Sequence, residues 1–240
     1  MSGHSKWATT HRQKAVVDAK RGAVFTKLGN MIAIAARSGT DPVMNPSLAL
    51  AIEKARQANM PQANIQRAVD RVADKNAAVL EEIVYEGYGP GGVGIIIEAA
   101  TDNRNRTLPE VKIALTKNGG SMAEPGSVAF QFTHKGVIRV KATGEDALLA
   151  VLDAGAEDAV EADGKLIVYT GMKEFHAVNK AITDAGFAVT EASLEYVPNN
   201  EIIVNDVETA RKLLKVLDAL EDIDDVVNVH HNADVTVDFE

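Results

Sequence analysis

Cysteine is absent from this chain, and so are long hydrophobic runs. Without cysteine the chain has no disulfide bond, no thiolate nucleophile and no cysteine-ligated zinc, which fits a reducing compartment and argues against redox chemistry. No stretch approaches the ~18 apolar residues of a membrane-spanning helix, and the first residues lack the apolar core of a secretory signal. We therefore expect a cytoplasmic protein that does not engage a membrane.

Signatures of catalysis and of nucleotide binding are also missing. The glycine-rich stretch from Tyr85 to Gly94 resembles a phosphate-binding loop, but Ile95-Ile96-Ile97 after it is typical of a strand rather than of the helix such a loop needs. A tight connection between two strands is the favoured interpretation. His230 and His231 point to opposite faces of a predicted strand, without an accompanying carboxylate pair. We expect no enzymatic activity, no metal and no cofactor.

What is present is an inversion of charge along the chain. Residues 1–76 contain 12 Lys and Arg against 5 Asp and Glu, whereas residues 77–240 contain 13 against 29. The net charge of −9 thus conceals a segment of +7 joined to a segment of −16. A basic module on an acidic chain is typical of a surface that binds a polyanion, so we expect the first third to contact nucleic acid.

The apolar pattern divides the chain into domains. With 240 residues and 46% hydrophobic content, the chain is long enough for two or three of them. Helical spacing predicts three helices in a basic domain of residues 1–78. Ser38 to Pro42 ends the first helix, and Asn45-Pro46 starts the second as an N-cap followed by proline. Met60-Pro61 precedes the third, which ends near Asp74.

Strands and helices alternate after residue 78. In residues 134–198 the order β-α-β-β-α-β predicts a complete ferredoxin-like domain. Its predicted strands are 135–141, 157–162, 165–170 and 187–196, and its predicted helices are 145–154 and 173–185.

The residues on either side supply two halves of another such unit. The predicted elements of the two halves are strand 93–100, helix 106–118 and strand 127–132, then strand 201–205, helix 207–220 and strand 225–231. A further strand is predicted at 82–86. We therefore predict a discontinuous domain of residues 79–133 plus 199–240. The fold class is α+β, with an N-terminal three-helix domain followed by two ferredoxin-like α+β domains, one inserted into the other.

Cations border the apolar face of the first predicted helix. Lys20 and Lys27 are seven residues apart along one edge, and Lys14 and Arg21 along the other. An aromatic residue among cations in the preceding segment suits phosphate contact with base stacking. The candidate nucleic-acid contacts are Lys6, Trp7, His11, Arg12, Lys14, Lys20, Arg21, Lys27, Lys54, Arg56 and Arg67. The alternative is a solvated basic helix with Trp7 in the core.

Two other features have alternative interpretations. Arg104 and Arg106 lie where a strand end meets a helix start, so they either hold an anion or pin a domain interface. Phe130 and Phe132 alternate onto one face of a predicted strand, as in an RNA-recognition sheet, although packing in the core is favoured.

Several segments together resemble the YebC/PmpR family of bacterial probable transcriptional regulators, which has a mitochondrial relative that activates translation of cytochrome oxidase subunit one. The segments are Gly3 to Trp7, Asp18 to Gly22, Phe25 to Leu28, Asn59 to Pro61, Tyr85 to Val93, Thr101 to Thr107 and Gly126 to Val128. The resemblance implies a helical domain followed by two α+β domains. It also implies DNA binding for some members and, for others, ribosome association that helps difficult sequences such as proline runs.

The chain departs from the family where basic residues are expected, at Ala23, Ser47, Ala49 and Gln62. We expect a nucleic-acid-binding regulator of gene expression, with DNA as the first target and a monomer favoured. One alternative is a ribosome-associated translation activator that binds ribosomal or transfer RNA and relieves stalling. Another is a protein-interaction module that does not bind nucleic acid.

Overall fold

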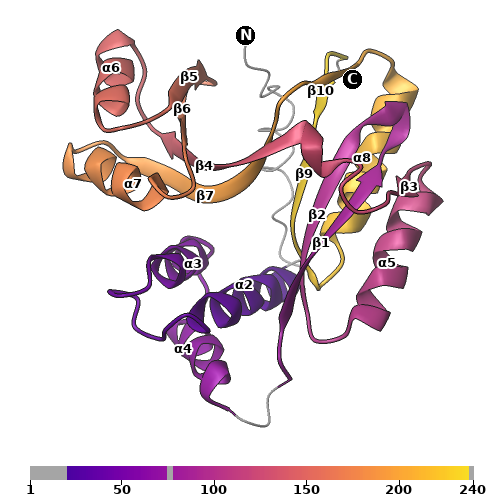
Figure 1. Cartoon of the computed structure of the whole chain (residues 1–240), viewed down its shortest axis with the longest axis horizontal. Helices are drawn as coiled ribbons and strands as arrows, with labels where there is room; N and C mark the ends of the chain where they lie inside the picture. Colours follow the sequence, from indigo (N-terminus) through magenta and orange to yellow (C-terminus); the bar gives the residue numbers. More distant parts are fainter. Residues whose placement is uncertain (1–20, 75–77, 238–240) are drawn as a thin grey trace. The chain divides into compact units, whose positions relative to one another are not determined.

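The structure, a computed structural model, describes residues 21–74 and 78–237, and for Arg21 the backbone alone (Figure 1). The described residues form two compact units, Phe132–Asn199 and the residues on either side of it. The chain therefore leaves the larger unit after Gln131 and returns to it at Asn200. No helix in the described ranges is long and apolar enough to cross a bilayer.

The larger unit begins with a small helical domain. Its elements are α2 (Arg21–Ala36), α3 (Pro46–Gln57), α4 (Gln62–Asp70) and the 3-10 turn η2 (Arg71–Ala73). Buried apolar side chains from all three helices, and from Met60 between α3 and α4, form its core. The helical ones are Leu28, Ile32, Ala36, Leu48, Ala51, Ile52, Ala55, Ile65, Ala68 and Val69.

The breaks between these helices are the predicted ones. Asn45 caps α3, because its backbone is extended and its side-chain oxygen accepts the Leu48 N–H at 3.1 Å. Pro46 follows at the first helical position, where a missing N–H costs nothing. The predicted start of the first helix, near residue 11, lies outside the described residues.

The smaller unit, Phe132–Asn199, has the predicted β-α-β-β-α-β order. Its strands pair antiparallel in the spatial order β5-β6-β4-β7, which is the ferredoxin-like arrangement. The elements are β4 (Phe132–Val140), α6 (Glu145–Asp153), β5 (Asp158–Ala162), β6 (Lys165–Thr170), α7 (Phe175–Asp184) and β7 (Val189–Pro198).

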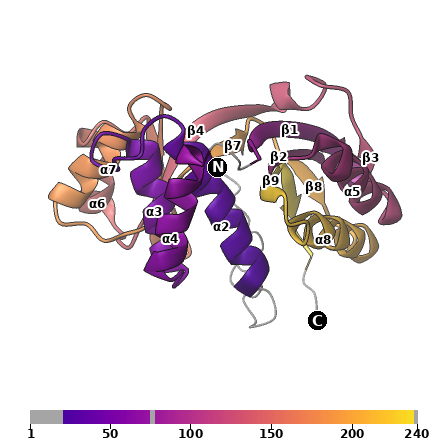
Figure 2. The same cartoon turned by 90° about the horizontal axis from the view of Figure 1, so that it is seen from below.

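The rest of the larger unit is built on an antiparallel sheet of order β3-β1-β2-β9. Figure 2 shows α5 and α8 together on one face of this sheet. The elements are β1 (Glu81–Tyr88), η3 (Pro90–Gly92), β2 (Gly94–Thr101), α5 (Arg104–Lys117), β3 (Ser121–Met122), η4 (Ala129–Gln131), β8 (Ile202–Val204), α8 (Val207–Glu221), β9 (Val226–His231) and β10 (Ala233–Val235). The α+β class, with one unit inserted into another, is confirmed.

The connection between β1 and β2 is tight, as predicted. Gly91 and Gly92 both have a φ of 78°, the left-handed region that glycine adopts without strain. The Gly89 N–H donates to the Val93 carbonyl at 2.7 Å across the turn. The glycine-rich stretch therefore turns the chain between two paired strands.

The predicted strand 127–132 is wrong. The segment wraps around the carboxylate of Glu86, a buried residue of β1. That carboxylate accepts the N–H groups of Gly126, Val128 and Ala129 at 2.5, 2.6 and 2.8 Å. Burial raises the pKa of Glu86, but these three donors outweigh it and the pKa is lowered. The Glu86 side chain therefore accepts the backbone N–H groups that a neighbouring strand would otherwise have bonded.

In a ferredoxin-like unit, the predicted strand 201–205 would lie beside strand 93–100, and the structure places it elsewhere. β8 pairs in parallel with β10 in a separate two-stranded sheet. The place beside β2 is occupied by β1, which pairs with it along its whole length, from Glu81 opposite Thr101 to Tyr88 opposite Gly94. A hairpin with a tight turn is a short-range pairing, and closing its loop costs less entropy than bringing in a partner about 100 residues away.

Candidate nucleic-acid interface

Most of the predicted nucleic-acid contacts lie outside the described side chains and stay predictions. These are Lys6, Trp7, His11, Arg12, Lys14, Lys20 and Arg21. The structure does place Lys27 on α2, Lys54 and Arg56 on α3, and Arg67 on α4.

Lys27 lies against another part of its own unit. Its ammonium group donates to the backbone carbonyl of Glu221, the last residue of α8, and its side chain is half-buried. Carbonyl groups at a helix C-terminus lack intrahelical partners and carry partial negative charge, so a cation there is favourable. Lys27 therefore fastens α2 to the end of α8, and its predicted phosphate contact stays a prediction.

The cations of α3 and α4 are more accessible. Lys54 and Arg56 lie in the last turn of α3, and Arg67 lies in the last turn of α4. Arg67 donates to the Ala63 carbonyl at 3.2 Å and to the side chain of Asn64. With the other described residues, neither Lys54 nor Arg56 forms an ion pair or side-chain hydrogen bond. Arg56 is also exposed, so among the predicted contacts that the structure describes it is the best placed to meet a phosphate.

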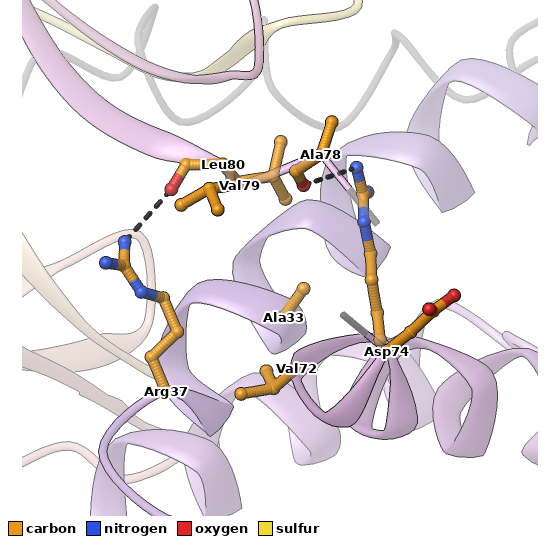
Figure 3. A pocket seen from close by; sticks show the side chains of 8 residues that line it. Ala33, Arg37, Val72, Asp74, Ala78, Val79 and Leu80 are labelled. Carbon is orange, nitrogen blue, oxygen red and sulfur yellow. Dashed lines mark hydrogen bonds between the residues drawn. The ribbon is translucent and has the colours of Figure 1, made fainter. Parts of the chain in front are cut away.

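Two arginines that the sequence analysis did not single out line one cavity of about 110 Å³, shown in Figure 3. Arg37 donates to the Leu80 carbonyl at 3.0 Å. Arg71 donates to Asn30 Oδ1 at 3.4 Å and to the Ala78 carbonyl at 3.5 Å, both long for hydrogen bonds. These contacts fasten the residues that lead into β1 onto the helical domain.

The other residues around this cavity are mainly apolar, namely Ala33, Val72 and Val79, with Asp74 as the one carboxylate among them. Arg71 also lies 4.0 Å from the carboxylate of Asp102, at the end of β2. Arg37 and Arg71 each follow the last residue of a helix, and this is their only signal in the sequence. Their carbonyl acceptors come close only when the chain folds.

Arg104 and Arg106 are paired with carboxylates of their own unit. Arg104 donates to Glu81 on β1. Arg106 donates to both carboxylate oxygens of Asp225, at 2.9 and 2.7 Å, and to Asp102 at 3.2 Å. Of the two alternatives for these arginines, this pairing fits fastening within the protein rather than capture of an external anion.

Asp225 is the centre of that network. The hydroxyl groups of Thr101 and Thr107 donate to its carboxylate at 3.0 and 2.6 Å. Burial raises the pKa of Asp225, but the hydrogen bonds from Thr107, Arg106 and Thr101 lower it by more. The net shift of the pKa is therefore downward. The turn between β2 and α5 is thereby held to the residue that precedes β9.

The two phenylalanines do not share a strand face. Phe130 lies in η4 with 72% of its surface exposed, whereas Phe132 is buried at the start of β4. The predicted alternation is therefore wrong, because residues 127–131 form turns instead of a strand.

The histidines of β9 take part in hydrogen bonds. His230 Nε2 lies 3.0 Å from Glu98 Oε2, which also accepts the Asn228 amide at 2.9 Å. His231 Nδ1 accepts the Ala233 N–H at 3.2 Å. Within the described ranges, no group of three His, Asp or Glu residues has the arrangement to hold a metal ion.

Comparison with known proteins matches nearly the whole chain to one family. The model for the TACO1/YebC protein N-terminal domain matches residues 5–75, and the model for the TACO1/YebC second and third domain matches residues 80–233. A probable transcriptional regulatory protein of Frankia casuarinae is 48% identical over 245 residues, covering 99% of this chain and 97% of the relative. One of Mycobacterium tuberculosis is 48% identical over 242 residues, with coverage of 98% and 96%. The crystal structure of a conserved hypothetical protein from Aquifex aeolicus is 40% identical, with a TM-score of 0.86 and coverage of 94% and 95%.

Proposed function

The chain belongs to the TACO1/YebC family, and we propose that it regulates gene expression by binding nucleic acid through its helical domain, with DNA as the first target. The relatives that share its full length are named probable transcriptional regulatory proteins. We propose further that it acts by binding, in the cytoplasm and without catalysis.

The observation that carries this proposal is the excess of cations in the helical domain. Residues 21–74 contain seven Lys and Arg against four Asp and Glu, within the +7 segment of residues 1–76. Cations on one module of an otherwise acidic protein attract the phosphate backbone and steer its approach. The accessible guanidinium of Arg56 supports this interpretation, whereas Ser47, Ala49 and Gln62 leave its neighbourhood less basic than the family pattern.

A surface that contacts phosphates does not by itself distinguish DNA from RNA, because phosphate contacts position a protein without reading sequence. Ribosomal RNA is the competing target, and sedimentation separates the two. Tagged protein in a cell lysate is run through a sucrose gradient with and without ribonuclease. Ribonuclease-sensitive migration with ribosomal particles would select the ribosome over DNA.

The binding itself is tested by titrating full-length protein against duplex DNA and single-stranded RNA over a range of salt. For about four phosphate contacts, log affinity against log salt should fall with a slope of about −3 to −4 on DNA. Undetectable or salt-independent binding to both nucleic acids would contradict the proposal.

Charge reversal identifies the contacting segment. Lys14→Glu with Lys20→Glu should reduce the salt slope by about one for each lost phosphate contact. Arg56→Glu with Arg67→Glu is the matched pair on α3 and α4. It should reduce the slope less, because Ser47, Ala49 and Gln62 stand nearby where the family pattern has basic residues. Equal losses from the two pairs would show that the surface is spread over all helices.

A further inference from the structure

The loop between α2 and α3 presents two adjacent apolar side chains to solvent. Val43 and Met44 have 85% and 81% of their surface exposed, more than any other large apolar residue among those described. Single exposed apolar side chains are ordinary on protein surfaces, but a neighbouring pair at the tip of a loop is a candidate contact. The pair belongs to the same domain as the proposed nucleic-acid surface.

Hydrogen bonds fix the shape of this loop. The side chain of Asp41 accepts the Val43 N–H at 2.9 Å, and its carbonyl accepts the next two N–H groups along the chain at 3.2 and 2.9 Å. The buried Asn45 side chain donates to the carbonyls of Ala35 and Gly39 at 2.8 and 2.7 Å. The apolar tip is therefore preorganised, which reduces the entropy lost when it binds.

Beside the tip is an open depression of about 580 Å³. Pro42 from the loop and Ala49 and Ile52 from α3 give it an apolar lining. Glu53, Arg56 and Gln57 complete the lining and supply a carboxylate, a guanidinium and an amide. This volume lies within the range of about 300–1,000 Å³ found for small-molecule sites in general.

We propose that the loop Pro42–Met44 and this depression hold an unstacked nucleobase, and this inference rests on the proposed function. Val43 and Met44 wedge against the base step while Pro42 and Ala49 contact the base face. Apolar side chains of this kind, proline and methionine included, are inserted between bases by proteins that distort nucleic acids. Arg56 meets the adjacent phosphate, and Glu53 and Gln57 are positioned for the polar edge of the base.

The charges around the depression favour a nucleotide over an apolar peptide. Arg56 has no partner among the described residues, so its guanidinium retains all its donors for a phosphate. The Asp41 carboxylate, the other acid near the tip, is already engaged by the Val43 N–H. An apolar surface flanked by the Arg56 guanidinium and the Glu53 carboxylate matches a base whose exocyclic amino group meets the acid while its phosphate meets the cation.

The test uses a double variant of the full chain, Val43→Thr together with Met44→Gln, called the loop variant. It is compared with the wild-type protein. The substitutions keep the size of both side chains while making them polar, and the exposure of the pair predicts unchanged folding. The matched control is Ile113→Thr with Ile203→Thr, since these residues are 60% and 66% exposed on α5 and β8. The probes are single-stranded RNA, single-stranded DNA and duplex DNA that carry 2-aminopurine, whose fluorescence reports unstacking.

We expect the wild-type protein and the control to change the fluorescence of the probe on binding. The loop variant should bind about tenfold more weakly at every salt concentration, with an unchanged salt slope and a smaller fluorescence change. Arg56→Gln should instead reduce the slope by about one. Comparison of the three probes shows which nucleic acid supplies the base.

Two failures are distinguishable. If the wild-type protein binds with the expected salt slope and the loop variant matches it in affinity and fluorescence, the base site is wrong while the proposed function stands, and a protein becomes the candidate occupant of the loop. If the wild-type protein binds none of the probes, the proposed function and the base site fall together.

Discussion

At the scale of single residues, a buried carboxylate fixes the path of a distant segment of the chain. The Glu86 carboxylate accepts three backbone N–H groups, and its lowered pKa shows that these donors more than offset its burial. Turns are thereby fixed at residues that lie 40 positions along the chain from Glu86. A single side chain determines the path of the segment that enters the smaller unit.

Glu86→Gln tests this role. A glutamine offers only one acceptor oxygen, and its NH₂ group would face backbone donors, so at least one backbone N–H loses its partner. We expect a loss of about 2–4 kcal/mol in the free energy of unfolding. Urea denaturation measures it, with Glu82→Gln as the control, because Glu82 is an exposed carboxylate on the same strand. Equal stability of the two variants would show that the carboxylate is dispensable.

At the scale of elements, the accuracy of sequence prediction followed the range of the interactions. The start of α3 was predictable because Asn45 and Pro46 act within one turn of helix. Segment 127–132 was not, because its apolar alternation matches a strand while Glu86, a distant acceptor, holds it in turns. The length and composition of β8 were likewise insufficient to reveal its parallel partner β10.

The same limit applies to the candidate site. Spacing along α2 identified Lys27 as a cation beside the apolar face but carried no information about the Glu221 carbonyl that it meets. Arg37 and Arg71 were missed because their acceptors come from the residues that enter β1. The local sequence pattern was enough to predict that Arg56 and Arg67 lie near helix ends. Their exposure to solvent could be read only from the folded structure.

The network that joins β2, α5 and β9 gives a prediction at this scale. The folded-state pKa of Asp225 is lowered, so its ionised form contributes stability that is fully present above the ordinary aspartate value of about 4 and is lost as the pH falls through the folded-state value. Asp225→Asn should cost about 2–3 kcal/mol at neutral pH, and its deficit should shrink as the solution is acidified below about pH 4.

Chemical denaturation at a series of pH values measures this difference. Asp224→Asn is the matched control, since the neighbouring carboxylate is exposed. A deficit for Asp225→Asn that stays constant from neutral to acidic pH would mean that ionisation of this residue does not stabilise the fold.

At the scale of the whole molecule, the chain enters and leaves the smaller unit through a pair of adjacent strands. Phe132 lies opposite Pro198 in the β4–β7 ladder, so the two ends of the unit are held within about 5 Å. In the larger unit, Gln131 accepts the Asn232 side-chain amide at 2.8 Å, and the Ile202 N–H donates to the Asn232 carbonyl at 2.7 Å. Both flanks of the insertion are therefore anchored to one buried residue.

This arrangement predicts that the two units fold separately. Residues 132–199 alone contain every strand of their sheet and should melt cooperatively. A chain in which a short glycine-rich linker replaces these residues should also melt cooperatively, because Gln131 and Ile202 both bond to Asn232 and the linker closes a short loop at little entropic cost. Residues 79–131 alone should not fold, since β2 would lose its neighbour β9 and α5 would lose α8. Circular dichroism and differential scanning calorimetry on the three chains test this division. Loss of cooperative melting in the linker-joined chain would show that the larger unit depends on its insertion.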